Sequence, residues 1–123
     1  MYSATLMDHF GNPRNVGVLD RYTVRGVSGN PNAGPFMVLY LDIHRKRIRN
    51  VSYQTYGCAA AIAAGSYLTE IVKGKSLEEA AGVDAVAIKN GLGGLPLGKE
   101  HCASTAISAL RHALDQVSAG GNS

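Results

Sequence analysis

The sequence predicts an α+β domain in which a three-stranded antiparallel sheet carries helices on one face, with a long helix at the C-terminal end. Two observations lead to this fold class. Alternating apolar residues dominate the first half of the chain, in runs bounded by glycine and proline, whereas after residue 58 the sequence is rich in alanine and follows helical spacing. Strands that come first along the chain, with helices after them, are typical of α+β folds.

Length and composition indicate one domain. The chain has 123 residues, of which 46% are hydrophobic, enough for one core. We therefore expect a single domain over residues 1–123, with a disordered tail over residues 118–123. The first ten residues lack the apolar stretch of a signal peptide, and no segment approaches the ~18 apolar residues of a membrane helix. These features predict a soluble, cytoplasmic protein that does not bind a membrane.

The first 35 residues are expected to contain little regular structure. Residues 3 to about 10 read as a short helix, and the loop at 11–17 follows because it contains Pro13 and two glycines. Residues 22–28 predict a weak strand. Two prolines within residues 29–35 cannot donate to a central strand ladder, so this segment is predicted to be a loop.

The next 21 residues predict a β-hairpin. Between residues 36 and 44 every odd position is aliphatic, which places one face of a strand in the core. Between residues 48 and 56, Val51, Tyr53 and Thr55 share one face opposite polar residues. A turn at residues 45–47 joins the two strands.

Helical signals fill the remainder of the chain. A helix of about four turns is predicted to begin after Cys58 and to end before Gly74. Ser76 and Glu79 have the spacing of a capping box, which predicts a second short helix. Asp84 is suited to cap a third helix that ends at residues 90–91. From residue 101, apolar residues recur at steps of three and four, which predicts a long amphipathic helix.

The net charge of +3 comes largely from one basic cluster at the hairpin turn, formed by Arg45, Lys46, Arg47 and Arg49. The plainest interpretation is a solvated turn, and contact with an acidic protein partner is the alternative. Nucleic-acid binding is disfavoured because no aromatic residues are interleaved with the basic ones.

Cys58 and Cys102 are the only cysteines, too few for a disulfide framework and consistent with free thiols in a reducing compartment. Each is predicted to lie at the start of a helix, where the helix dipole favours thiolate and lowers the thiol pKa. Thiolate is the form that metal binding and sulfur transfer require. The alternative is that both are small core residues, since a spacing of 44 residues makes no metal motif.

The adjacent pair of His101 and Cys102 is the stronger signal. Neighbours on a helix point about 100° apart, so both reach one ion only at a helix terminus. With Cys58 they would give three ligands, one short of a closed zinc site. A zinc enzyme is disfavoured because only Glu100 lies beside these positions, and it is expected to face solvent. His9, His44 and His112 are interpreted as surface or core histidines.

Several short motifs, in order along nearly the whole chain, resemble the IscU/NifU-type iron-sulfur scaffold family. They are Tyr2-Ser3, Asp8-His9-Phe10, Asn12-Pro13-Arg14-Asn15-Val16-Gly17, Thr55-Tyr56-Gly57-Cys58, Thr69-Glu70, Lys73-Gly74-Lys75-Ser76-Leu77-Glu78-Glu79-Ala80, Leu95-Pro96 and His101-Cys102. The family fold, three antiparallel strands with helices on one side, agrees with the fold class predicted above.

The resemblance implies a scaffold or carrier protein rather than an enzyme. Family members assemble a [2Fe-2S] cluster on three cysteines with an aspartate and a histidine, receive sulfur from a cysteine desulfurase and pass the cluster to accepting proteins. Carried over by position, Cys58 and Cys102 are cluster ligands, and Cys58, His101 and Cys102 bind iron or zinc. Cys102 is the expected persulfide acceptor. A monomer or weak homo-oligomer is expected.

The sequence departs from the family where the first cysteine and the aspartate normally lie. Ala33 and Pro35 occupy those positions, and neither side chain ligates a metal. Four protein ligands therefore require a substitute such as Asn32, or a partner. Residues 95–99 also differ from the Leu-Pro-Pro-Val-Lys chaperone site of IscU-type members. The 43 residues between Cys58 and Cys102 leave no room for the insertion of zinc-dependent SufU-type members.

Two hypotheses follow from this resemblance and its departures. The first is a cluster assembly scaffold that binds metal and accepts sulfur at an incomplete Cys/His site. The second is a divergent paralogue that binds zinc or a partner protein and builds no cluster.

Overall fold

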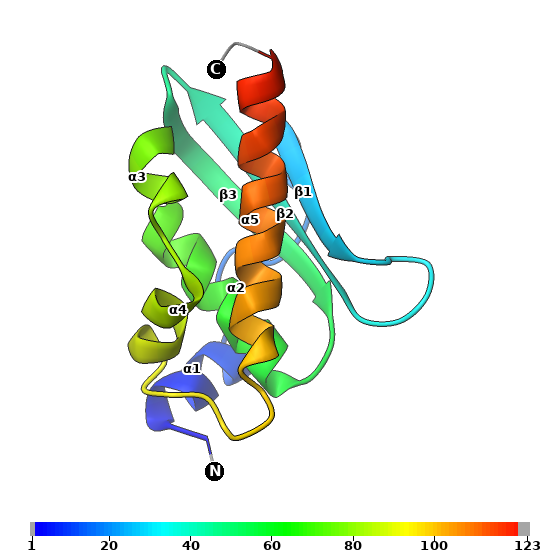
Figure 1. Cartoon of the computed structure of the whole chain (residues 1–123), viewed down its shortest axis with the longest axis vertical. Coiled ribbons are helices and arrows are strands. Elements are labelled where there is room, and N and C mark those ends of the chain that lie inside the picture. The colour runs from blue at the N-terminus through cyan, green and yellow to red at the C-terminus, as the bar shows by residue number, and fades with distance from the viewer. Residues whose placement is uncertain (1, 121–123) are drawn as a thin grey trace.

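The structure is a computed structural model that describes residues 2–120. Its sheet has three antiparallel strands in the order β1-β2-β3, as Figure 1 shows. The strands are β1 (Val24–Gly29), β2 (Phe36–His44) and β3 (Arg47–Tyr56). The first strand thus begins two residues later than the sequence predicted. The hairpin strands lie where the alternation of apolar residues placed them.

Five helices complete the described part of the chain: α1 (Ala4–Gly11), α2 (Ala59–Val72), α3 (Leu77–Ala81), α4 (Ala85–Gly91) and α5 (His101–Gly120). Helix α5 packs against β1 and β2, and α2 packs against β3. Both lie on the same face of the sheet (Figure 1). The predicted fold class, a three-stranded antiparallel sheet with helices on one face and a long C-terminal helix, is confirmed.

The register of the sheet explains how the two long helices fit on this face. Gly26 of β1 and Tyr53 of β3 both pair with Leu39 of β2, so all three positions face the helices. At Gly26 a side chain would collide with the backbone of Ala109 and Ala113 in α5. The Tyr53 hydroxyl donates a 2.7 Å hydrogen bond to the carbonyl oxygen of Ile62 in α2. These contacts fix α2 and α5 relative to the sheet.

The opposite face of the sheet is covered by the N-terminal loop rather than by helices. Val38 and Tyr40 are buried there, and the rings of Tyr22 and Tyr40 meet edge to face at 5.1 Å. The Ser52 hydroxyl donates to the carbonyl oxygen of Gly17 at 2.6 Å. This cover explains why even-numbered positions of β2 are apolar at its start.

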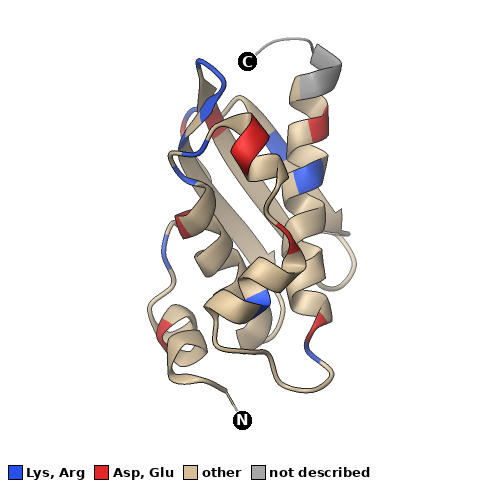
Figure 2. Ribbon diagram, turned by 60° about the vertical axis from the view of Figure 1, so that its left-hand side comes forward, with Lys and Arg blue, Asp and Glu red and all other residues tan. Residues whose placement is uncertain are grey.

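The hairpin turn is formed by Arg45 and Lys46, which both adopt positive φ, at 54° and 63°. The basic residues around it lie at the end of the sheet away from the loop that precedes α5 (Figure 2). Arg49 pairs with Asp42 at 2.9 Å, and Arg47 lies 3.9 Å from Glu79. Half of the basic cluster thus has a carboxylate partner within the chain, and contact with an acidic protein remains a prediction.

The helix termini follow the predicted caps. The Ser76 hydroxyl accepts from the Glu79 N–H while the Glu79 carboxylate accepts from the Ser76 N–H, a complete capping box. Asp84 caps α4 through the N–H of Ala87. Helix α5 continues to Gly120, three residues into the segment expected to be a tail, and residues 121–123 lie outside the described part of the structure. Within the described residues, no helix has the length and hydropathy to cross a membrane.

Two of the N-terminal motifs dock α1 onto α2. His9 is 5% exposed, and its Nδ1 lies 2.8 Å from the hydroxyl of Ser66. The side-chain amide of Asn15 donates to the Thr69 hydroxyl at 3.0 Å. His9 is thus a core histidine, while His44 and His112 are exposed, within the two roles predicted for them.

Candidate Cys/His site

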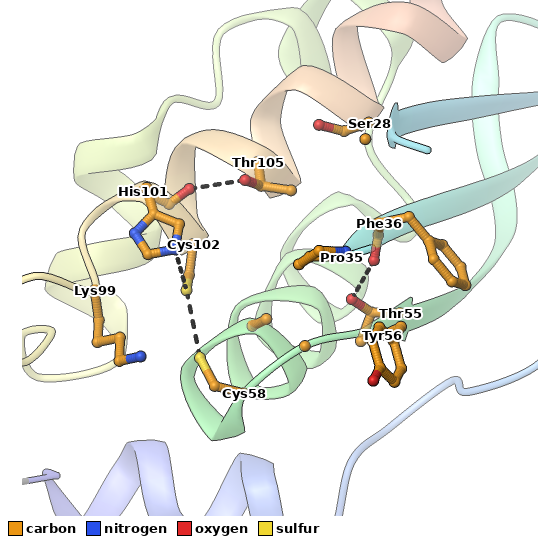
Figure 3. Close-up of a pocket in the computed structure, with 13 residues that line it drawn as sticks. Ser28, Pro35, Phe36, Thr55, Tyr56, Cys58, Lys99, His101, Cys102 and Thr105 are labelled. Atoms are coloured by element: carbon orange, nitrogen blue, oxygen red, sulfur yellow. Dashed lines mark hydrogen bonds between the residues drawn. The ribbon is translucent and has the colours of Figure 1, made fainter. Parts of the chain in front are cut away.

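The two cysteines meet although 43 residues separate them. Cys58 directly precedes α2, where the chain leaves β3, and Cys102 lies in the first turn of α5. Because α2 and α5 pack against each other, their first turns are side by side. The Sγ atoms of Cys58 and Cys102 are 3.8 Å apart (Figure 3). The two thiols therefore converge, which is one part of what the hypothesis from sequence required.

His101 is the first residue of α5, and its Nε2 lies 3.8 Å from the Sγ of Cys102. Adjacent side chains reach each other here because the helix begins at this residue, as the sequence argument required. The imidazole is exposed, whereas the neighbouring thiol is buried. Among the described hydrogen bonds none joins Cys58 to His101, so the two 3.8 Å contacts share Cys102 as their common member.

A cavity of about 280 Å³ opens beside the thiols. Its lining combines the three predicted residues with the start of β2, the end of β3 and the loop before α5 (Figure 3). Lys99 provides an ammonium group on one side of the pocket, and the stacked rings of Phe36 and Tyr56, with centroids 6.5 Å apart, lie on the other side (Figure 3). The site is a pocket with room for a small ligand and not a closed core position.

The two thiols differ in their ionisation. Partial burial acts to raise the pKa of Cys58, but the N–H groups of Ala61 and Ala60, the Cys102 side chain and the charge of Lys99 outweigh it. Its pKa therefore lies below the usual value of a thiol. Both N–H groups belong to the first turn of α2, so the start of this helix stabilises the thiolate. The prediction of a lowered pKa is confirmed for Cys58.

For Cys102 the same prediction is wrong. Its side chain is 2% exposed, and burial, with the neighbouring Cys58 as a second cause, raises its pKa to about 11. Desolvation disfavours the charged thiolate more strongly than the helix terminus favours it. The sequence placed both residues at helix starts correctly, but it could not show which one points into the core.

The donor set of two thiols and an imidazole suits zinc or iron, and the distances between these groups fit part of such a site. A tetrahedral zinc ion with bonds of about 2.3 Å to sulfur holds two thiolates about 3.8 Å apart. The Cys58–Cys102 distance matches this edge. Among the described residues, however, no group of three or more His, Cys, Asp or Glu side chains is arranged to hold a metal ion. The exposed imidazole of His101 must therefore turn toward Cys58 before all three residues can share an ion.

The loop at residues 30–35, which contains Ala33 and Pro35, borders the pocket but supplies no metal ligand. Pro35 lines the pocket, whereas Ala33 and Asn32 are exposed and are not among its lining residues. The loop is closed by its own bonds, from the Ala33 N–H to the Asn30 carbonyl and from the Asn32 N–H to the Asn30 side chain. The suggestion that Asn32 replaces the missing ligand therefore has no support in this geometry.

Sequence reasoning assigned no site role to Lys99, Phe36 or Tyr56. Phe36 and Tyr56 are cross-strand partners at the open end of the hairpin. Their pairing follows from the register of two strands that the sequence did predict, so this signal was available. The place of Lys99 depends on how residues 93–100 fold back toward α2, and no local pattern predicts that path.

Comparison with known proteins gives a consistent result. A family model described as the NifU-like N terminal domain matches residues 1–120. An iron-sulfur cluster assembly scaffold protein, IscU 1 of Archaeoglobus fulgidus, is 46% identical over 114 residues, covering 93% of this chain and 74% of its own length. The IscU scaffold of Aquifex aeolicus is 40% identical, covering 92% of this chain and 73% of its own length.

Solved structures agree with the fold. The N-terminal part of a NifU-like protein from Brucella abortus superposes with a TM-score of 0.65 at 14% identity, covering 94% of this chain and 91% of that one. A candidate SUF-system scaffold from Fervidobacterium islandicum gives 0.73 at 22% identity, covering 92% and 96%. At these identities the likeness concerns the fold alone. The family match over residues 1–120 and the sequence identity to IscU proteins show that this chain belongs to the IscU/NifU family.

Proposed function

We propose that this chain is a scaffold or carrier in iron-sulfur cluster assembly that accepts sulfur on its thiol pair and binds metal through Cys58, His101 and Cys102. The observation that carries the proposal is the meeting of two cysteines, far apart in sequence, with an imidazole at the wall of one pocket. Two free thiols of a small domain have no structural need to meet at an open pocket. Membership of a family whose relatives are named as cluster scaffolds supports the same role.

Sulfur acceptance requires a thiol that a donor protein can reach. A thiolate attacks the outer sulfur of a persulfide on a cysteine desulfurase, and the donor leaves as its own thiolate. The sequence named Cys102 as the acceptor, but its side chain is 2% exposed, whereas Cys58 is only partly buried. We infer that Cys58 meets the donor first and that Cys102 receives the sulfur across the 3.8 Å between them.

A metal ion bound at this site would keep one coordination position free of protein ligands from this chain. Two thiolates and an imidazole hold three positions of a tetrahedral ion and leave the fourth for sulfide or a group from another protein. If the cargo is a transient [2Fe-2S] cluster, an incomplete set of protein ligands favours its release to an accepting protein over its retention. The cytoplasm, where the two thiols stay reduced, is the compartment in which this chemistry is expected.

The second candidate function is a zinc-binding or partner-binding module that builds no cluster. The observation that favours it is the loop at residues 30–35, which borders the pocket with Pro35 and supplies no ligand atom. Such a protein would keep the family fold and its partner surfaces after losing the assembly task.

Two measurements test the proposal. After incubation with a cysteine desulfurase and cysteine, mass spectrometry should find added sulfur on peptides that contain Cys58 or Cys102, or these peptides joined by a disulfide where the sulfur has already left. Substitution of the exposed Ser108 by alanine is the control and should leave loading unchanged. If a full-site relative is loaded and this chain shows neither added sulfur nor a disulfide between Cys58 and Cys102, sulfur acceptance is ruled out.

The second measurement separates the two functions. The protein is purified without added metal, and its zinc, iron and acid-labile sulfide are determined. Iron and sulfide in equal amounts support the scaffold. Stoichiometric zinc without sulfide supports the module.

A further inference from the structure

We propose that this chain converts a bound persulfide into free sulfide, with the second cysteine of the pair as the reductant. The inference rests on the proposed function only in that a persulfide must reach one of the two thiols. It adds a chemical outcome: the sulfur leaves as hydrosulfide, and Cys58 and Cys102 end as an intrachain disulfide.

The sulfur atoms of Cys58 and Cys102 need only a short movement to form a disulfide bond. The two sulfur atoms are 3.8 Å apart, and a disulfide bond requires about 2.05 Å. Each cysteine therefore has to move its sulfur by only about 1 Å, an adjustment within the range of a side-chain rotation. Both residues start helices, and the open pocket beside them leaves room for this motion. A persulfide on either residue is within reach of the other thiol.

The release of sulfide balances in bonds and in electrons. A thiolate that attacks the inner sulfur of a neighbouring persulfide forms a sulfur–sulfur bond and breaks the bond to the outer sulfur. The outer sulfur takes the electron pair and leaves as hydrosulfide. The two cysteine sulfurs are oxidised by two electrons in total, and the persulfide sulfur is reduced by two. No other oxidant or reductant takes part, and a dithiol reductant restores the thiols for the next turnover.

Release of sulfide competes with transfer of the outer sulfur from one cysteine to the other. Attack on the outer sulfur moves it from one cysteine to the other and regenerates the same pair of groups, so this exchange is reversible. Attack on the inner sulfur releases a small anion that diffuses out of the pocket. Among the described residues no third cysteine stands in the pocket to take the sulfur, because Ala33 and Pro35 occupy the loop beside it.

The pocket also suits the leaving group. Its volume of about 280 Å³ is several times the ~30 Å³ that a water molecule occupies in the liquid, so hydrosulfide fits beside the thiols. The ammonium group of Lys99 lines the same space and provides the only lysine or arginine charge among the lining residues. A cation there stabilises the negative charge that develops on the departing sulfur.

The experiment uses the whole chain, treated with a chelator to remove metal, and one equivalent of glutathione persulfide as the donor, which leaves as glutathione after it has transferred its outer sulfur. We expect close to one equivalent of sulfide per chain in a single turnover without added reductant, and a peptide in which Cys58 and Cys102 are joined by a disulfide. The Cys102→Ser variant should keep the extra sulfur as a persulfide on Cys58, whereas the Cys58→Ser variant should take up little sulfur because its remaining thiol is buried. Their sulfide release should fall to the level of the donor alone. Ser108→Ala should behave like the wild type.

A wild-type chain that retains its persulfide, or that does not react with the donor, overturns the inference. Circular dichroism of the two serine variants checks that they are folded, and the wild-type result decides the question by itself if they are not. The proposed function fails separately. If a desulfurase cannot load the chain but glutathione persulfide still yields sulfide and the disulfide, the conversion stands and the assembly role does not.

Discussion

The imidazole of His9 in α1 and the hydroxyl of Ser66 in α2 form a 2.8 Å hydrogen bond inside the protein, where both side chains are buried. The Ser66 hydroxyl also accepts from the backbone N–H of Arg14 at 2.9 Å. This bond joins the N-terminal helix to the helix that carries Cys58 at its start. It gives the first prediction.

Burial, together with the positive charge of Arg14, lowers the pKa of His9 more than Glu70 and Asp8 raise it. The unfolded chain takes up a proton near pH 6.5, whereas the folded chain does so only at lower pH. The unfolded state therefore binds more protons in this window, and the free energy of unfolding should fall as pH drops below about 6.5, then level off below the folded pKa.

Urea unfolding at a series of pH values measures this effect. The His9→Gln variant should lose this part of the pH dependence. It should also be less stable at neutral pH by about 1 kcal/mol, since an amide replaces the imidazole in the bond to Ser66. His44→Gln, at an exposed position on the hairpin, is the matched control and should keep the wild-type profile. An unchanged profile in His9→Gln would exclude His9 as its source.

The second prediction concerns Gly26, where β1 passes under α5. A Cβ atom there would collide with the backbone of Ala109 and Ala113, which cannot move aside as a flexible side chain would. Gly26→Ala should therefore lower the free energy of unfolding by about 3 kcal/mol, although alanine loses less backbone entropy on folding. Gly11→Ala, with nothing within 4 Å of its new methyl group, should stay within about 1 kcal/mol of the wild type. Urea denaturation compares the two variants, and equal stabilities would contradict the packing argument.

The third prediction concerns the unequal reactivity of the thiols. With a pKa of about 11, Cys102 carries roughly 100-fold less thiolate at neutral pH than an ordinary cysteine. Cys58, with a lowered pKa and partial exposure, should react first with iodoacetamide in the metal-free protein. Peptide mapping over time measures both rates, and urea-unfolded protein, in which the two should react alike, is the control. Faster labelling of Cys102 in the folded protein would contradict the assigned burial.

The fourth prediction concerns Pro35, the position at which the family resemblance implies an aspartate. Pro35 lines the pocket, so Pro35→Asp should add an oxygen ligand beside Cys58 and Cys102 and raise zinc affinity by about tenfold, or about 1.4 kcal/mol. Pro31→Asp, at an exposed loop position outside the pocket lining, is the matched control. Isothermal titration with zinc compares them. When Ala33→Cys is combined with Pro35→Asp, the amounts of iron and sulfide that the protein retains should also rise. Equal zinc affinities of the Pro35→Asp and Pro31→Asp variants would show that the loop cannot reach the site.

The fold could be predicted from sequence because its signals are local. The alternation in residues 36–44, the capping box at Ser76 and Glu79 and the apolar spacing in α5 each specify an element within a few residues. The position of the site residues at helix starts was predicted in the same way. The end of α5 was not, because no residue before Gly120 interrupts the helix.

The amino-acid sequence alone determined the element types, their order and the presence of Cys58, His101 and Cys102 at two helix starts. Only the tertiary structure decided that the thiols lie 3.8 Å apart and that one is partly exposed while the other is buried. The physical reason for this difference is that helix dipoles and caps act within one turn of the chain. The burial of each cysteine depends instead on how segments 43 residues apart pack together. Desolvation by those segments, which no local pattern records, separates the two cysteines chemically.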